Sequence, residues 1–231
     1  MPPLKLRELE RSLNNVYLKI YREIKKDENQ LLQYWPAFNK YNGLVYDNTR
    51  AAISIVQQQA SESVNRKTKT NPYPTSADID LIRQQTDKTV DSFWRKIQMA
   101  IQRVPDEQEP NIPAYLEIVA ITAITGTYAL AMKSKINQLV QLSSNPALVG
   151  GAITLNRMPL FLWITRLDEK TCIELPNGEP GCAALNGTAW FTDDPGIPTP
   201  GELGLNGTHP HCRCFLDLIM PDDARYDRLI R

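Results

Sequence analysis

The chain has 231 residues, of which 42% are hydrophobic and 23% charged, a balance typical of a folded protein with a buried core. The formal net charge is zero, so total charge gives no argument for a nucleic-acid partner. Four cysteines in this length argue against a secreted disulfide scaffold, and the charged amino terminus lacks the apolar core of a secretory signal, so we expect synthesis in a reducing cytoplasm.

The first predicted element is a long amphipathic helix. Apolar residues recur at steps of three and four from Leu6 to Ile24, which places them on one stripe of a helix. Lysines and arginines occupy the other faces and predict either a solvated surface or a surface close to packaged DNA or an acidic partner. We expect this helix to end near Trp35-Pro36, because the residue before a proline is disfavoured in the helical conformation.

Two further helices are expected before residue 105. After a loop through Asn42-Gly43, the pattern predicts a shorter helix over about residues 48–63, followed by a polar connection. The tetrapeptide from Thr75 to Asp78 is typical of a helix start, because an acidic side chain three residues after a threonine can complete a capping box. Apolar residues at helical spacing continue behind it as far as Val104.

The next helix is expected from about Ala114 to Leu142, and its first half is apolar nearly all round. That length approaches the length of a membrane span. Glu117, several threonines and the uninterrupted continuation through Lys133 and Lys135 favour instead a helix buried on every side of a bundle. We therefore expect no membrane span.

The last third of the chain combines strands with a cysteine-rich segment. Met158–Thr165 is apolar and aromatic and predicts a buried strand, and Phe215–Ile219 predicts a second strand that pairs with it. Pro221–Arg231 is expected to contain a terminal helical turn. The sequence thus predicts an α+β fold, with a mainly α-helical amino-terminal bundle over residues 1–157 and a small β-containing domain over residues 158–231.

All four cysteines and both histidines lie between Thr165 and Leu216, a segment that we call the Cys/His knuckle. Its second cysteine pair has one intervening residue, so in extended backbone both sulfurs project to the same side. Two such pairs, or three cysteines and a histidine, can supply the four ligands of a structural Zn²⁺ site. The candidate metal ligands are Cys172, Cys182, Cys212, Cys214 and His209.

The spacing of these residues leaves three alternatives open. Nine residues separate Cys172 from Cys182, whereas tight zinc turns have close pairs, so disulfides and reduced thiols stand beside structural zinc. Catalysis is not expected, because a hydrolytic zinc site keeps one coordination position open and four cysteines would close it. The knuckle has two limbs, one with Cys172 and Cys182 and the other with Cys212 and Cys214. Arg213 is a natural bidentate partner for Asp168 if these limbs face each other.

Two sequence strings in this region resemble a known family. They are W-x-x-x-x-D-x-x-T-C and, after a Pro/Gly-rich span, H-P-x-C-R-C, and they are similar to the phage head morphogenesis domain of the Mu-F-like minor head proteins. The resemblance covers about the last third of the chain, and the spacing of the first cysteine pair departs from the family's close C-x-x-C. The residues that carry it are Trp163, Asp168, Thr171, Cys172, His209, Pro210, Cys212, Arg213 and Cys214.

The resemblance implies a structural, non-enzymatic virion component of a tailed phage or prophage. Such a protein lies inside the head near the portal, and in the host cytoplasm during assembly. Its implied partners are portal and capsid proteins and packaged DNA, and its implied role is head morphogenesis with DNA packaging or ejection. On this hypothesis the helix from Leu6 to Ile24 is the candidate partner contact.

The alternative function is a zinc-dependent nucleic-acid-binding module. A basic surface around the knuckle would favour that alternative. From Arg166 to the end, however, the chain has eleven acidic residues against six lysines and arginines. The charge distribution therefore favours the structural hypothesis.

Overall fold

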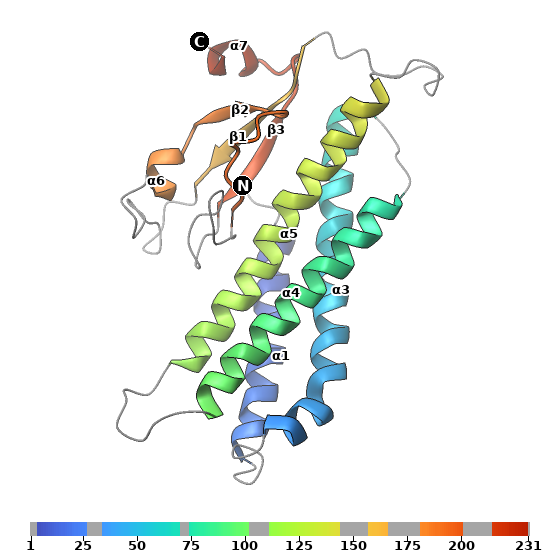
Figure 1. Ribbon diagram of the computed structural model, residues 1–231. Helices are drawn as coiled ribbons and strands as arrows, with labels where there is room; N and C mark the ends of the chain where they lie inside the picture. The colour runs from blue at the N-terminus through green and yellow to red at the C-terminus, as the bar shows by residue number, and fades with distance from the viewer. Residues whose placement is uncertain are drawn as a thin grey trace.

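The computed structural model describes residues 4–26, 34–69, 74–101, 111–143, 157–165, 181–200 and 214–230. Within these residues, four long helices lie side by side as a bundle and a small sheet lies beside α5 (Figure 1). The helices are α1 (Leu4–Lys26), α3 (Tyr34–Thr68), α4 (Ser76–Ile101) and α5 (Ile112–Ser143). The described part is thus α+β with helices predominating, as the sequence predicts.

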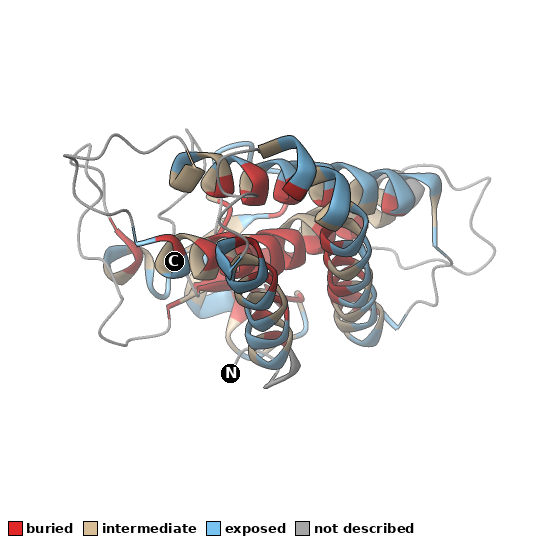
Figure 2. Cartoon of the chain, turned by 90° about the horizontal axis from the view of Figure 1, so that it is seen from below, coloured by how far each residue is buried: buried red, intermediate tan, exposed pale blue. Residues whose placement is uncertain are grey.

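The bundle is held by apolar stripes that the helices turn toward one another. Figure 2 shows buried residues on the facing sides of the helices and exposed residues on the outside. α5 packs against all three other long helices, which explains why its sequence is apolar nearly all round. Its segment Ile112–Val140 is long and apolar enough to cross a membrane, yet 72% of its most apolar stretch is buried within the protein.

α3 begins earlier and is longer than predicted. The expected helix end at Trp35-Pro36 and the expected loop through Asn42-Gly43 are both wrong, because all four residues lie inside α3. Proline is tolerated in a first helical turn, where its missing N–H would have no helical partner. Farther along, the indole Nε1 of Trp94 on α4 donates to Asn42 Oδ1 at 2.9 Å, so a tertiary contact fixes Asn-Gly as helix rather than turn.

The start of α4 is confirmed as a reciprocal capping box. The backbone N–H of Asp78 donates to Thr75 Oγ1 at 3.3 Å, and the backbone N–H of Thr75 donates to Asp78 Oδ2 at 2.8 Å. Two backbone donors that the helix itself cannot satisfy are thereby paired. This local arrangement explains why the helix starts where the sequence indicates.

The sheet has three antiparallel strands in the order β2-β1-β3. The central strand β1 (Leu160–Ile164) pairs with β3 (Phe215–Ile219), as predicted. Its other neighbour, β2 (Ala189–Phe191), was not predicted. The expected carboxy-terminal helical turn is confirmed as α7 (Tyr226–Leu229).

The two faces of the sheet have different partners. On the inner face, Trp163 pairs in register with Leu216, and both belong to the same buried cluster as the core of the bundle. On the outer face, Leu162 and Ile219 pack with Tyr226 of α7. The sheet is therefore the middle layer between the bundle and α7. The division into domains at residues 157 and 158 stays a prediction.

Candidate functional site

The Cys/His knuckle is described only at its base. Among the residues predicted to form a site, Trp163, Cys182 and Cys214 belong to the described part of the chain. Within that part, no group of three or more His, Cys, Asp or Glu side chains could hold a metal ion. Whether the cysteines bind zinc, form disulfides or remain reduced thiols is therefore still a matter of prediction. The predicted site residues outside the described ranges are Asp168, Thr171, Cys172, His209, Pro210, Cys212 and Arg213.

The fold brings the two described cysteines to the same end of β1. Cys182 is the first residue of the short helix α6 (Cys182–Leu185), and Cys214 directly precedes β3. Because Phe215 pairs in register with Ile164, Cys214 lies beside the point where β1 ends. Both cysteines are buried, in the same cluster as Trp163. Both cysteines thus lie at the same end of β1.

A threonine joins the parts of this base. Thr165 follows β1; its Oγ1 donates to the carbonyl oxygen of Cys182 at 2.5 Å and accepts a hydrogen bond from Trp163 Nε1 at 3.1 Å. Its backbone N–H donates to Asn186 Oδ1 at 2.9 Å. One residue therefore ties the end of β1 to the start of α6 and to the turn after α6. This role of Thr165 was not predicted; a hydroxyl at a strand end, able to bond local backbone groups, is the signal that could have indicated it.

The turn after α6 returns the chain to β1. Gly187 has a φ of 81°, in the left-handed region that glycine adopts without steric cost. Its N–H donates to the carbonyl oxygen of Trp163 at 2.9 Å, and the N–H of Trp163 donates to the carbonyl oxygen of Thr188 at 2.8 Å. Both backbone groups of Trp163 are therefore hydrogen-bonded to this turn, while Leu216 of β3 lies opposite Trp163 in register on the other side of β1. The motif tryptophan is fixed from both sides.

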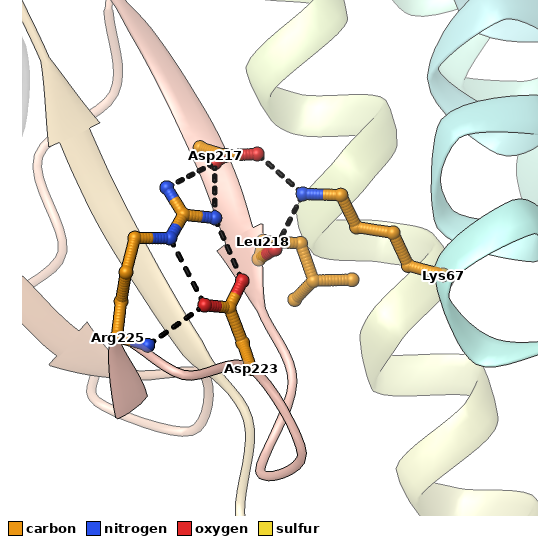
Figure 3. A network of polar contacts seen from close by, with 5 residues as sticks. All are labelled: Lys67, Asp217, Leu218, Asp223 and Arg225. Carbon is orange, nitrogen blue, oxygen red and sulfur yellow. Dashed lines mark hydrogen bonds and ion pairs between the residues drawn. The ribbon is translucent and has the colours of Figure 1, made fainter. Parts of the chain in front are cut away.

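A second polar cluster connects the sheet to the bundle (Figure 3). Lys67, near the end of α3, donates to Asp217 Oδ1 on β3 at 2.5 Å and to the carbonyl oxygen of Leu218 at 2.6 Å. Arg225, next to α7, donates to the other oxygen of Asp217 at 3.2 Å. Its guanidinium also bonds both carboxylate oxygens of Asp223, at 3.0 and 2.7 Å. Two cations thus face two carboxylates across three elements.

The charges of Asp223 and Arg225 are stable near neutral pH. Hydrogen bonds from the side chain and backbone of Arg225 lower the pKa of Asp223 to about 2, and the same pairing raises the pKa of Arg225. An efficient general acid or base has a pKa near the working pH, far from that of Asp223. Asp223 and Arg225 are therefore suited to tying β3 to the segment before α7, rather than to proton transfer.

The apolar stripe of α1 is not the partner contact expected from the sequence. Leu13 and Ile20 are each 2% exposed and lie in the core of the bundle, where α3 and α5 cover α1. That expectation was wrong, because the apolar stripe of α1 packs against other helices of the same chain. The exposed residues of α1 include Arg11, Lys19 and Arg22.

The described part of the site consists of a buried base for the knuckle and a charged tie between sheet and bundle. Both arrangements position chain segments, and neither has the form of a nucleophile with its base. Comparison of the chain with protein-family models, with curated proteins and with solved structures finds no match.

Proposed function

We propose that this chain is a minor head protein of a tailed phage or prophage, with a structural role beside the portal. The observation that carries the proposal is the pair of strings W-x-x-x-x-D-x-x-T-C, from Trp163, and H-P-x-C-R-C, from His209. They are similar to the head morphogenesis domain of Mu-F-like proteins. The role is head assembly together with packaging or ejection of DNA.

The burial of two motif residues and of the neighbouring Cys182 supports a structural rather than a chemical use of the motif. Trp163, Cys182 and Cys214 are all buried, and a thiol packed in this way is poorly accessible to reagents in solvent. A catalytic cysteine needs an activating neighbour and access for its substrate. Burial thus favours a role in holding the knuckle together.

The proposal includes a structural Zn²⁺ ion in the knuckle. Cys182 and Cys214 approach the end of β1 from different limbs, so their positions fit a cross-link between the limbs. The remaining ligands would be Cys172 and Cys212, with His209 as the alternative to one cysteine. A closed tetrahedral site of this kind supplies local folding free energy and no reaction.

The direct test is to find the chain in purified particles of the phage or induced prophage that encodes it. We expect it in few copies per particle, and deletion of its gene should leave shells that form but contain less DNA or infect poorly. A plasmid that supplies the wild-type chain should restore infectivity, whereas one that supplies the Cys212→Ser/Cys214→Ser variant should not.

Two results would contradict the proposal. If mass spectrometry finds no trace of the chain in particles that contain all other head proteins, it is not a head component. If the deletion leaves DNA content and infectivity unchanged, the role in packaging and delivery is wrong. Zinc-dependent DNA binding by a chain that is absent from particles would favour the nucleic-acid-binding alternative.

A further inference from the structure

A groove of about 330 Å³ lies between α4 and α5. It is lined from Gln85 to Lys96 on α4 and from Tyr115 to Gly126 on α5, about three turns of each helix and therefore about 17 Å long. The two helices run antiparallel (Figure 1), and Lys96 Nζ lies 4.8 Å from the centroid of the Tyr115 ring at one end of the groove. The groove is thus elongated along the helix pair.

The two walls of this groove differ in charge. The α4 wall contributes Lys88, Arg95 and Lys96, and none of the described lining residues is acidic. The α5 wall is uncharged, with apolar side chains at its Tyr115 end and small side chains toward Gly126. An occupant that matches both walls must be acidic along one side and apolar along the other. The lining residues from α5 are Tyr115, Ile118, Val119, Thr122, Ala123 and Gly126.

The basic wall can exchange its present contacts for those of a partner. Arg95 pairs with Asp91 at 2.6 Å, but their side chains are 74% and 58% exposed. Exposed pairs of this kind contribute between zero and about 1 kcal/mol, so a carboxylate from a partner can compete with Asp91. Lys96 is held over the ring of Tyr115, which belongs to the opposite wall of the groove.

We propose that this groove binds an acidic amphipathic helix of a partner protein. A helix laid lengthwise would place its apolar residues against Ile118 and Val119 and its acidic residues against Lys88 and Arg95. Recognition of an amphipathic helix in a groove depends on apolar anchors spaced over two to three turns, which the length of the groove accommodates. Opposite charges across the contact fix the orientation and register of the bound helix.

A phosphate backbone fits the groove less well than a helix. The bases of single-stranded nucleic acid bind by stacking on aromatic platforms, and among the described lining residues Tyr115 is the sole aromatic side chain, already covered by Lys96. The apolar and small side chains of the α5 wall would contact no phosphate. The inference is independent of the proposed virion role, because it rests on the two groove walls alone.

The test uses two designed peptides of about 14 residues, close to four helical turns. Both carry leucines at helical spacing; one has glutamates along the flanking positions and the other has lysines there. Fluorescence anisotropy of each labelled peptide is measured against the full chain. We expect saturable binding of the glutamate peptide and none of the lysine peptide. A photo-crosslinker on the glutamate peptide should label residues 85–96 and 115–126.

Variants then locate the binding. Lys88→Glu/Arg95→Glu/Lys96→Glu should weaken binding of the glutamate peptide about tenfold or more, because three attractive charges become repulsive. Thr122→Trp should weaken it by filling the groove, with circular dichroism as the check that the bundle still forms. The matched control is Arg11→Glu/Lys19→Glu/Arg22→Glu, which changes net charge equally on exposed positions of α1 and should bind as wild type.

Several outcomes would overturn the proposal. They are a glutamate peptide that does not bind, crosslinks outside the two helix segments, and equal affinity for the wild type and the charge-reversed groove. If duplex DNA or vesicles of anionic lipid bind in place of the peptide, and the same groove variants abolish that binding, the helix is also rejected and the groove is assigned to that other ligand class.

Discussion

Lys135 of α5 and Asp78 of α4 form an ion pair inside the bundle, with 3.2 Å between Nζ and Oδ2 and side-chain exposures of 1% and 2%. Burial by itself would raise the pKa of Asp78, but the backbone hydrogen bond from Thr75 and the bond from Lys135 together hold that pKa below its ordinary value. The carboxylate therefore stays charged, and it serves the capping box and the ion pair at once.

Lys135→Met should destabilise the bundle strongly. The substitution leaves the Asp78 carboxylate buried without its cation, and breaking a buried pair from one side costs about 3–5 kcal/mol in the free energy of unfolding. Urea denaturation of wild type and variant measures this cost. Lys19→Met, at an exposed position on α1, is the control and should change stability by less than about 0.5 kcal/mol. A Lys135→Met variant as stable as that control would contradict the role of the pair.

Asp223→Asn should remove a pH-dependent part of the stability. The folded-state pKa of Asp223 is about 2 and its ordinary value is 3.8, so the unfolded chain takes up the proton first as pH falls. The stabilisation is therefore present above pH 3.8 and is lost between that value and about 2. The difference in unfolding free energy between wild type and variant should shrink over this range. A difference that is constant from pH 7 to pH 2 would show that the carboxylate charge is not its source.

Leu13→Asp should prevent folding rather than release a partner. Leu13 is buried against the other helices, so the substitution removes apolar contacts and buries an unpaired charge, at a combined cost above about 4 kcal/mol. Circular dichroism and thermal unfolding report the loss, with Asn15→Asp on the exposed side of α1 as the matched control. Normal folding of the Leu13→Asp variant would mean that this side of α1 does not form part of the core.

Thr165→Val should loosen the base of the knuckle. The change keeps the shape of the side chain but leaves Trp163 Nε1 and the Cys182 carbonyl oxygen without their partner, which costs about 1–3 kcal/mol. Hydrogen exchange should rise first around β1 and α6. Thr188→Val, at an exposed threonine of the neighbouring turn, is the control. Equal exchange in both variants would argue against a joining role for Thr165.

The metal hypothesis predicts about one zinc ion per chain in protein purified under reducing conditions. Cys214→Ser should lose the metal, and a chelator should unfold the knuckle while the helical circular dichroism signal persists, because metal binding here is local folding energy. Elemental analysis and thermal unfolding provide the measurements. Metal-free protein with an unchanged thermal transition would reject zinc, and a Cys172–Cys182 disulfide found by mass spectrometry would identify the cross-link.

The elements predicted correctly are those whose signals are local. The capping residues Thr75 and Asp78 indicate the start of α4, and the apolar run of β1 indicates a buried strand. The elements that were missed depend on distant contacts. Asn42-Gly43 remains helical beside Trp94 of another helix, and β2 has only three residues, whose strand character comes from pairing with β1.

The same distinction applies to the candidate site. The concentration of cysteines in one segment is visible in the sequence, and Cys182 and Cys214 lie at the same end of β1. The ion pair between Lys67 and Asp217 joins residues 150 positions apart, so no local sequence pattern indicates it. The burial of Lys135 is equally hidden, because a lysine in a helix is ordinarily solvated and its partner Asp78 lies on another element.

The hydrogen bond from Thr165 to Cys182 has a consequence for how the knuckle can vary. It joins the two ends of the segment 166–180, so folding of the sheet already meets the entropic cost of bringing those ends together. Once a loop is closed at its base, doubling its length costs only about 0.6 kcal/mol. Additional residues between positions 166 and 180 should therefore cost little in the free energy of folding. Sequence length can drift at this point while the sheet and the bundle remain unchanged.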